Sequence, residues 1–239
     1  MSHVLLLPGN NTLSHVAKAL VLRSALQAHG HTVSLAINAA RADFLHRNAI
    51  PFEHVLPDLQ DADGGNRPSS FWFRPEHVER VLRAELELLR RLRPNRVLGV
   101  FRFTAPISAA LAGIPYDSVS CGAMLPTLPG PLGFHADEPG AAAQAEALDF
   151  FRRSCARRMN PALARLGHPP VADLLELQFG ARTYLWDYPE FQPLPAAPDV
   201  HHLGPLFWSG WPASASAADA RGEAAALDAL RGPLAFVAF

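Results

Sequence analysis

The opening forty residues constrain the fold most, because they alternate a strand, a helix and a second strand. Residues 3–7 form a continuous apolar run, typical of a parallel strand buried on both faces. From Ser14 onward apolar residues recur at helical spacing, and Gly30 stands where a helix C-terminal cap is expected. Residues 32–37 predict the next strand. Such a βαβ unit requires a parallel sheet and a right-handed crossover.

The same alternation continues almost to the end of the chain. Further helices are expected at residues 41–48, 75–92, 105–112 and 141–166, further strands at 52–55, 96–100 and 116–120, and short elements at 172–177, 182–185 and 200–203. This pattern predicts an α/β fold with a doubly wound, Rossmann-like parallel sheet. We expect that domain to span residues 1–208, followed by a linker and short helix over 209–232.

Residues 233–239 are expected to form the first strand of a second domain whose remainder is missing. The alternative is that this strand completes the first sheet as its edge.

Composition excludes several classes of protein. The net charge of −1 and the scattered basic residues argue against a nucleic-acid partner. No apolar stretch is long enough to cross a bilayer, and the features of a signal peptide are missing, so a cytoplasmic location is expected. Cys121 and Cys155 have no metal-binding spacing, so no metal site is expected. Abundant alanine and arginine indicate a bacterial source.

The first strand ends in a loop, residues 8–13, at the sheet edge where ligands bind in doubly wound folds. The loop lacks both the G-x-G-x-x-G fingerprint and the P-loop lysine, which disfavours dinucleotide chemistry. The chain has no G-x-S-x-G motif, which argues against an α/β-hydrolase. Ser14 is expected to be the helix N-cap, which places His15 in the first turn. The helix dipole disfavours an imidazolium there, so His15 is a candidate general base; the alternative is a structural histidine.

Five segments, in order and in one register, carry a resemblance to a known family. They are SHVAKAL with AHGHTV (residues 14–33), RPNRVLGVFR with LAGIPY (93–116), the element at 184–189, HLGPL (202–206) and the strand at 234–239. These segments resemble the family-1 glycosyltransferases of GT-B fold, which include antibiotic and macrolide glycosyltransferases. The resemblance implies the N-terminal half of a GT-B fold, the half that holds the acceptor.

The resemblance implies that His15 is the general base, which deprotonates an acceptor hydroxyl as it attacks the anomeric carbon of a nucleotide sugar with inversion. Ser14 and Lys18 replace the family's usual glycine and proline, and Val100 stands where the family has the aspartate that orients and charges this histidine. His15 should therefore be a weaker base. Three explanations remain: an acidic acceptor such as a phenol or enol, a substitute carboxylate with Asp117 as the nearest candidate, or a binding role alone.

The acceptor pocket is expected in the irregular loops above the sheet. The candidate residues are Asn10, Asn11, Phe71, Trp72, Phe73, Met124, Leu125 and Phe134. Aromatic residues on a loop suit a flat, apolar acceptor. Equally, the aromatic trio at 71–73 could pack its loop onto the domain.

The resemblance places the donor, a UDP- or dTDP-sugar, on the missing C-terminal domain, near a helix N-terminus. This chain is then expected to bind no cofactor or metal and to be inactive alone. Its partners are a small-molecule acceptor, the donor through the missing domain, and optionally a second copy in a homodimer. The expected context is natural-product biosynthesis. The alternatives are a non-catalytic small-molecule-binding or auxiliary domain of a degenerate glycosyltransferase and, more weakly, an epimerase.

Overall fold

The computed structural model describes residues 1–9, 12–38, 42–55, 72–125, 137–190, 194 and 197–210. Its helices are α1 (Leu13–Ala28), α2 (Ala42–Arg47), α3 (Pro75–Leu92), α4 (Ala105–Ala112) and α5 (Ala141–Arg165), with 3-10 turns η3 (Gly122–Met124) and η4 (Leu174–Gln178). Its strands are β1 (His3–Pro8), β2 (Thr32–Ile37), β3 (Glu53–His54), β4 (Arg96–Val100), β5 (Tyr116–Ser120), β6 (Thr183–Leu185) and β7 (Val200–His202). The predicted α/β alternation is confirmed.

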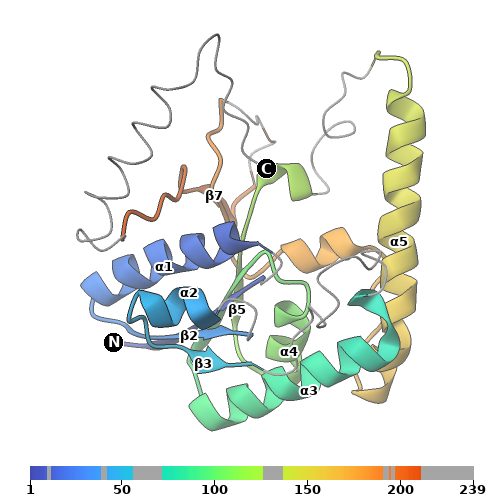
Figure 1. Cartoon of the computed structure of the whole chain (residues 1–239). Coiled ribbons are helices and arrows are strands. Elements are labelled where there is room, and N and C mark those ends of the chain that lie inside the picture. The colour runs from blue at the N-terminus through green and yellow to red at the C-terminus, as the bar shows by residue number, and fades with distance from the viewer. Residues whose placement is uncertain are drawn as a thin grey trace, which may run out of the picture.

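The seven strands form one parallel sheet in the order β3-β2-β1-β4-β5-β6-β7. The chain builds outward from β1 through β2 and β3, and then returns to place β4 on the other side of β1 (Figure 1). The strand order therefore reverses between β1 and β4. In doubly wound sheets the carboxyl ends of the strands at this reversal form the ligand-binding crevice.

Helices cover both faces of the sheet because alternate strand residues point to opposite sides. On one face Val16, Ala19 and Leu20 of α1 pack against Leu6 and Val100 of the strands. On the opposite face α3 and α4 cover β1 and β4, and α5 packs outside them (Figure 1). The two layers hold the carboxyl edge of the sheet, and the start of α1 above it, in a fixed arrangement.

Helix α1 begins at Leu13, two residues before the start that the predicted N-cap implies. Its N-cap is Thr12, not Ser14, and no side chain caps it; instead the Ser14 hydroxyl lies 2.8 Å from that of Thr12. The prediction of Ser14 as N-cap was wrong because these two hydroxyls bond to each other. At the other end Gly30 adopts φ 80°, and its N–H donates to Gln27 while that of His31 donates to Leu26, a Schellman motif.

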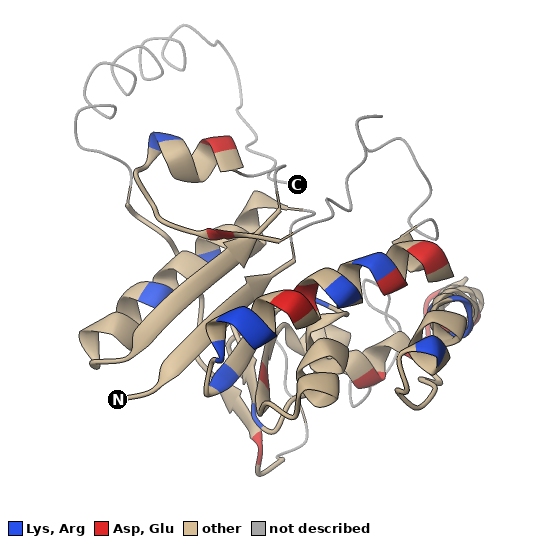
Figure 2. Ribbon diagram, turned by 90° about the horizontal axis from the view of Figure 1, so that it is seen from below, with Lys and Arg blue, Asp and Glu red and all other residues tan. Residues whose placement is uncertain are grey.

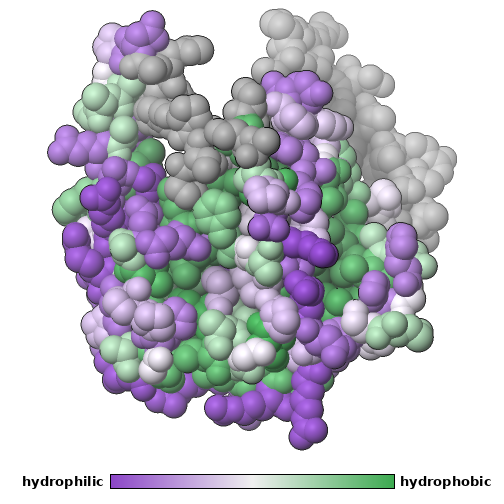
Figure 3. All heavy atoms as spheres, turned by 180° about the vertical axis from the view of Figure 1, so that it is seen from behind, coloured by the Kyte–Doolittle hydropathy of each residue, from purple (hydrophilic) through white to green (hydrophobic). Residues whose placement is uncertain are grey.

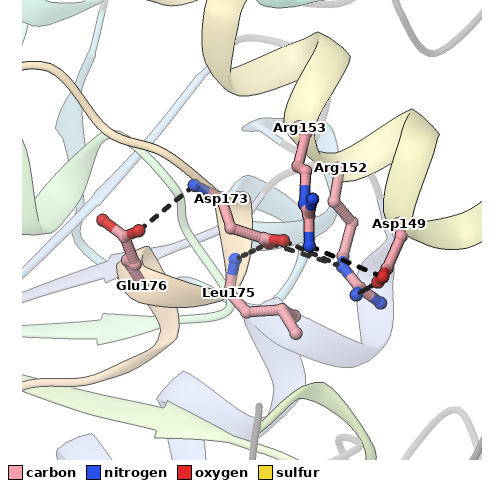
Figure 4. A network of polar contacts seen from close by, with 6 residues as sticks. All are labelled: Asp149, Arg152, Arg153, Asp173, Leu175 and Glu176. Atoms are coloured by element: carbon pink, nitrogen blue, oxygen red, sulfur yellow. Dashed lines mark hydrogen bonds and ion pairs between the residues drawn. The ribbon is translucent and has the colours of Figure 1, made fainter.

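Helix α5 is anchored at one end only. One face of its carboxyl-terminal half is buried in the core, whereas the amino-terminal half projects from the body and exposes Phe150 (Figure 1). At mid-helix Arg152 pairs with Asp149 on its own helix and with Asp173 (Figure 4). Asp173 also caps η4 by accepting a hydrogen bond from the Leu175 N–H. Arg152 therefore ties α5 to the segment that leads into β6.

Basic and acidic residues are interspersed along α3 (Figure 2), whereas the charged residues of α1 are all basic and α4 carries none. On the face shown in Figure 3 apolar side chains fill gaps between polar ones. Within the described residues, no helix combines the length and apolar character that a bilayer crossing requires. Residues 211–239, which include most of the expected linker and the expected last strand, lie outside the described part of the chain. The domain division therefore stays a prediction.

Candidate functional site

The residues that follow four neighbouring strands define one edge of the sheet. Gly9 follows β1, Phe101 follows β4, Cys121 follows β5 and Trp186 follows β6. Because the strands are parallel, their carboxyl ends lie side by side, and the first turn of α1 starts directly above them. His15 of that turn meets this row of residues.

The His15 imidazole is enclosed by aromatic rings. Its centroid lies 4.8 Å from that of Phe101 and 6.1 Å from that of Trp186, and only 8% of the residue is exposed. Burial, together with the nearby Lys18 ammonium, lowers the pKa of His15 to about 4, although a hydrogen bond to the Gly9 backbone acts in the opposite direction. The imidazole is therefore neutral at pH 7, as expected from the sequence. The expected cause was the helix dipole, whereas the largest cause in the structure is desolvation by burial.

Phe101 reaches His15 through an unusual backbone conformation. Its φ is 51°, in the left-handed region that non-glycine residues rarely adopt, and its N–H donates to the Val119 carbonyl at 3.0 Å. This turn brings the ring onto His15 instead of into the core. Strain of this kind tends to be kept where function needs the resulting geometry.

Lys18 lies one turn after His15 on the same face of α1. Its Nζ stands 4.7 Å from the centroid of the Trp186 ring, a cation–π contact. Burial lowers the pKa of Lys18, while Cys121 and Asp187 oppose that shift. Trp186 thus contacts both His15 and Lys18 of α1, so the three side chains form one cluster.

Asp187 and Cys121 complete the cluster on the side of β5 and β6. The Asp187 carboxylate accepts a hydrogen bond from the Gly122 N–H at the start of η3, and its backbone carbonyl lies 3.0 Å from Nδ1 of His202. Burial, reinforced by Asp187, raises the pKa of the Cys121 thiol to about 11. Cys121 is therefore protonated at neutral pH and is not an activated nucleophile.

Asp117 does not join this cluster. It is the second residue of β5, near the amino ends of the strands, and its Oδ1 accepts from Arg96 at 2.6 Å and from the Arg182 N–H at 3.1 Å. A strand rises about 3.3 Å per residue, so Asp117 lies roughly 10 Å before the carboxyl edge. The proposal that Asp117 replaces the family's aspartate is therefore wrong: its carboxylate neutralises Arg96.

The predicted acceptor residues divide into three groups. Asn10, Asn11, Phe71 and Phe134 lie outside the described residues. Phe73 is 8% exposed and packs in the core between α3, α4 and α5, with Trp72 partly buried against it, and Leu125 is also buried. For Phe73 and Leu125 the structure favours a packing role. Met124 is half-buried in η3, three residues after Cys121, and remains near the site.

Phe73 nevertheless connects to the site through other rings. It contacts Phe103 at 5.8 Å, and Phe103 contacts Phe101 at 5.7 Å in edge-on geometry. Phe101 in turn lies against His15. A row of aromatic rings therefore runs from the α3–α5 core to the imidazole.

A buried ionic network fixes the strand ends beneath the site. Arg102 donates to Glu85 of α3 at 2.7 Å and to the Pro8 carbonyl at 3.0 Å, and the Thr104 hydroxyl donates to the same Glu85 oxygen at 2.6 Å. Glu85 is fully buried. These contacts join α3, the end of β1 and the turn after β4, which hold Phe101 and Gly9 in place.

Sequence reasoning found His15 but missed Lys18, Phe101 and Trp186 as its neighbours. The sequence did contain a signal, because Phe101 follows the predicted strand at 96–100 and Trp186 follows the short element expected at 182–185. In a parallel sheet those positions meet at one edge. The strand order, which decides which of these positions are adjacent, was the missing information.

A separate hollow lies away from this cluster. It has a volume of about 450 Å³ beside β6 and β7 and is lined by Arg182, Tyr184, Pro198, Asp199 and His201. Among the described residues no group of three or more histidine, cysteine or acidic side chains could hold a metal ion.

The fold and the site define a Rossmann-like α/β domain with a histidine above the strand-order reversal. Solved glycosyltransferases share this fold: the calicheamicin glycosyltransferase CalG4 (TM-score 0.59, 17% identity, 89% of this chain and 54% of that one) and the glycosyltransferase of kitacinnamycin (0.57, 20%, 85% and 51%). SsfS6 of Streptomyces sp. SF2575 is similar at a TM-score of 0.52 and 19% identity, over 83% of this chain and 56% of its own.

A curated relative agrees with these structures. The PGL/p-HBAD biosynthesis rhamnosyltransferase of Mycobacterium bovis is 26% identical over 111 residues, which are 46% of this chain and 24% of the relative. No protein-family profile matches the chain. The chain therefore has the α/β fold of GT-B glycosyltransferases and spans about half the length of those solved structures, and about a quarter of the curated relative.

Proposed function

We propose that this chain is the acceptor-binding half of a nucleotide-sugar-dependent glycosyltransferase that acts on a small, apolar or aromatic hydroxyl compound with inversion. The observation that supports this most is the position of His15 over the strand-order reversal, on a fold shared with glycosyltransferases. The nearby Phe101 and Trp186 rings suit a flat acceptor.

In this proposal His15 is the general base. It accepts the acceptor proton while the acceptor oxygen bonds to the anomeric carbon and the nucleotide diphosphate leaves. The neutral imidazole has the correct protonation state, and the Gly9 backbone orients the ring through a hydrogen bond. The donor, a UDP- or dTDP-sugar, would bind a second domain; the solved VinC structure, a glycosyltransferase, is a complex with DTDP. A role in bacterial natural-product biosynthesis is part of the same proposal.

The test compares His15→Ala with the wild type in the complete gene product, incubated with UDP- and dTDP-sugars and aromatic acceptors. Mass spectrometry of the acceptor should show transfer by the wild type and at least a tenfold loss in the variant, with acceptor affinity kept. Unchanged transfer in His15→Ala would remove His15 from the mechanism.

A second candidate is a small-molecule-binding domain without catalysis. It is favoured by the low exposure of His15, at 8%, and by Val100, which is fully buried in the core beside α1. On this alternative the complete wild-type protein binds the acceptor but transfers no sugar from any donor.

A further inference from the structure

The charged side chain that acts on His15 is a lysine, the opposite sign from the carboxylate that a charge-relay arrangement uses. Lys18 shares a face of α1 with His15, and both contact Trp186, at 4.7 Å for Nζ and 6.1 Å for the imidazole centroid. An ammonium in this position opposes the formation of an imidazolium and stabilises an anion. The site is therefore better suited to negative charge on the acceptor than to positive charge on the base.

The charged and titratable neighbours of Lys18 come from two other elements. Asp187 follows β6, and its carboxylate is bonded to the Gly122 backbone; Cys121 follows β5. Within the described part of the chain no carboxylate lies within 4.0 Å of Lys18, so its ammonium is not neutralised by a direct ion pair. Lys18 is half-buried, with its ammonium over the face of the Trp186 ring, where a ligand anion could meet it.

We infer that the acceptor is a phenol or an enol and that Lys18 binds the oxyanion formed from its hydroxyl. This inference rests on the proposed function and narrows its substrate class. The acceptor O–H bond breaks and the proton passes through His15 to water. The oxygen bonds to the anomeric carbon, and the bond from that carbon to the diphosphate breaks, with the electron pair leaving on the nucleotide. An aliphatic alcohol is too weakly acidic for this arrangement.

Binding of para-nitrophenol tests the inference without any sugar donor, because its phenolate is coloured. With the purified chain, the phenolate should bind about tenfold more tightly than the neutral phenol, so that the pKa of the bound probe falls by about one unit. The neutral analogue para-nitroanisole should bind like the neutral phenol. Absorbance titrations at several pH values measure the affinities for the phenolate, the neutral phenol and para-nitroanisole.

Variants separate charge from packing. Lys18→Met should abolish the preference for the phenolate while affinity for para-nitroanisole remains, and Lys18→Arg should keep the preference. Arg90→Met removes one exposed cation from α3, on the opposite face of the sheet, and should behave like the wild type.

Three results would overturn the inference. Equal binding of phenolate and para-nitroanisole by the wild type rejects the acidic acceptor but leaves acceptor binding, and hence the proposed function, standing. Binding of neither probe rejects both. A preference for the phenolate that survives in Lys18→Met would reject Lys18 as its cause.

Discussion

At the scale of single residues, His15 couples the site to pH. Its folded pKa of about 4 lies below the ordinary value of 6.5. Above pH 6.5 both the folded and the unfolded chain hold a neutral imidazole, so nothing is lost. Below pH 6.5 the imidazole of the unfolded chain binds a proton while that of the folded chain stays neutral, so the free energy of unfolding falls as the pH drops to about 4.

The free energy of unfolding should therefore fall by about 2 kcal/mol more between pH 7 and pH 5 in the wild type than in His15→Gln. Urea titrations of both proteins at the two pH values measure this difference. Equal pH dependence in the two proteins would show that His15 titrates normally in the folded chain.

Val100 allows a direct change to the electrostatics of His15. Its carbonyl accepts a 2.8 Å hydrogen bond from the Gly9 N–H, and Gly9 also bonds the imidazole, so a carboxylate at position 100 would stand close to His15. Val100→Asp should raise the pKa of His15 by about one unit or more, because an anion stabilises the imidazolium.

NMR titration of the His15 ring measures that pKa. Val100→Asn serves as the control, since it introduces a polar group of similar size without charge, and should leave the pKa near its wild-type value. A shift of equal size in both variants would mean that altered burial, not charge, is the cause.

At the scale of elements, the buried pair of Arg102 and Glu85 joins α3 to the strand ends under the site. Removing one partner leaves the other charge buried, so Arg102→Met should lower the free energy of unfolding by about 3–5 kcal/mol. Guanidinium titration checks this value.

The double variant Glu85→Met with Arg102→Met should recover most of that loss, because neither charge is then left unpaired. The control is Arg83→Met, which breaks a pair with Glu79 whose arginine is 61% exposed, and should change stability by at most about 1 kcal/mol. A double variant as unstable as the sum of its single variants would contradict this account.

Helix α5 offers a second comparison within one element. Met159 is 1% exposed in the core and Phe150 is 68% exposed on the projecting half. Met159→Ala should cost about 2–5 kcal/mol of unfolding free energy and Phe150→Ser at most about 0.5 kcal/mol. Similar losses, measured by thermal or urea unfolding, would indicate that the projecting half of α5 packs against another surface in solution.

At the scale of the whole molecule, the order and type of the helices and of β1 to β5 followed from the sequence, whereas η4, β6 and β7 were expected only as short elements of no stated type and η3 was not predicted. Hydrophobic periodicity is a local signal, so the residues of each strand and each helix in a βαβ unit can be recognised from a short stretch of sequence. The site followed only in part. His15 could be located because it lies in the first turn of the helix that follows the first strand, which needs no knowledge of distant contacts.

Asp117 and Phe73 could not be placed correctly because their positions depend on contacts with residues far away in the sequence. The partner of Asp117 is Arg96, on a neighbouring strand, and Phe73 packs against α5, far along the chain. Similarly, the approach of Phe101 to His15 depends on a left-handed backbone conformation that no local pattern announces. Tertiary contacts decided each of these positions.

The central claim is that the acceptor binds against His15 and Trp186 at the carboxyl edge of the sheet. Intermolecular nuclear Overhauser effects between a bound aromatic acceptor and labelled side chains test it most directly. We predict contacts from the acceptor to the His15 and Trp186 rings. Contacts instead to Tyr184 and His201, in the hollow beside β6 and β7, would contradict the claim.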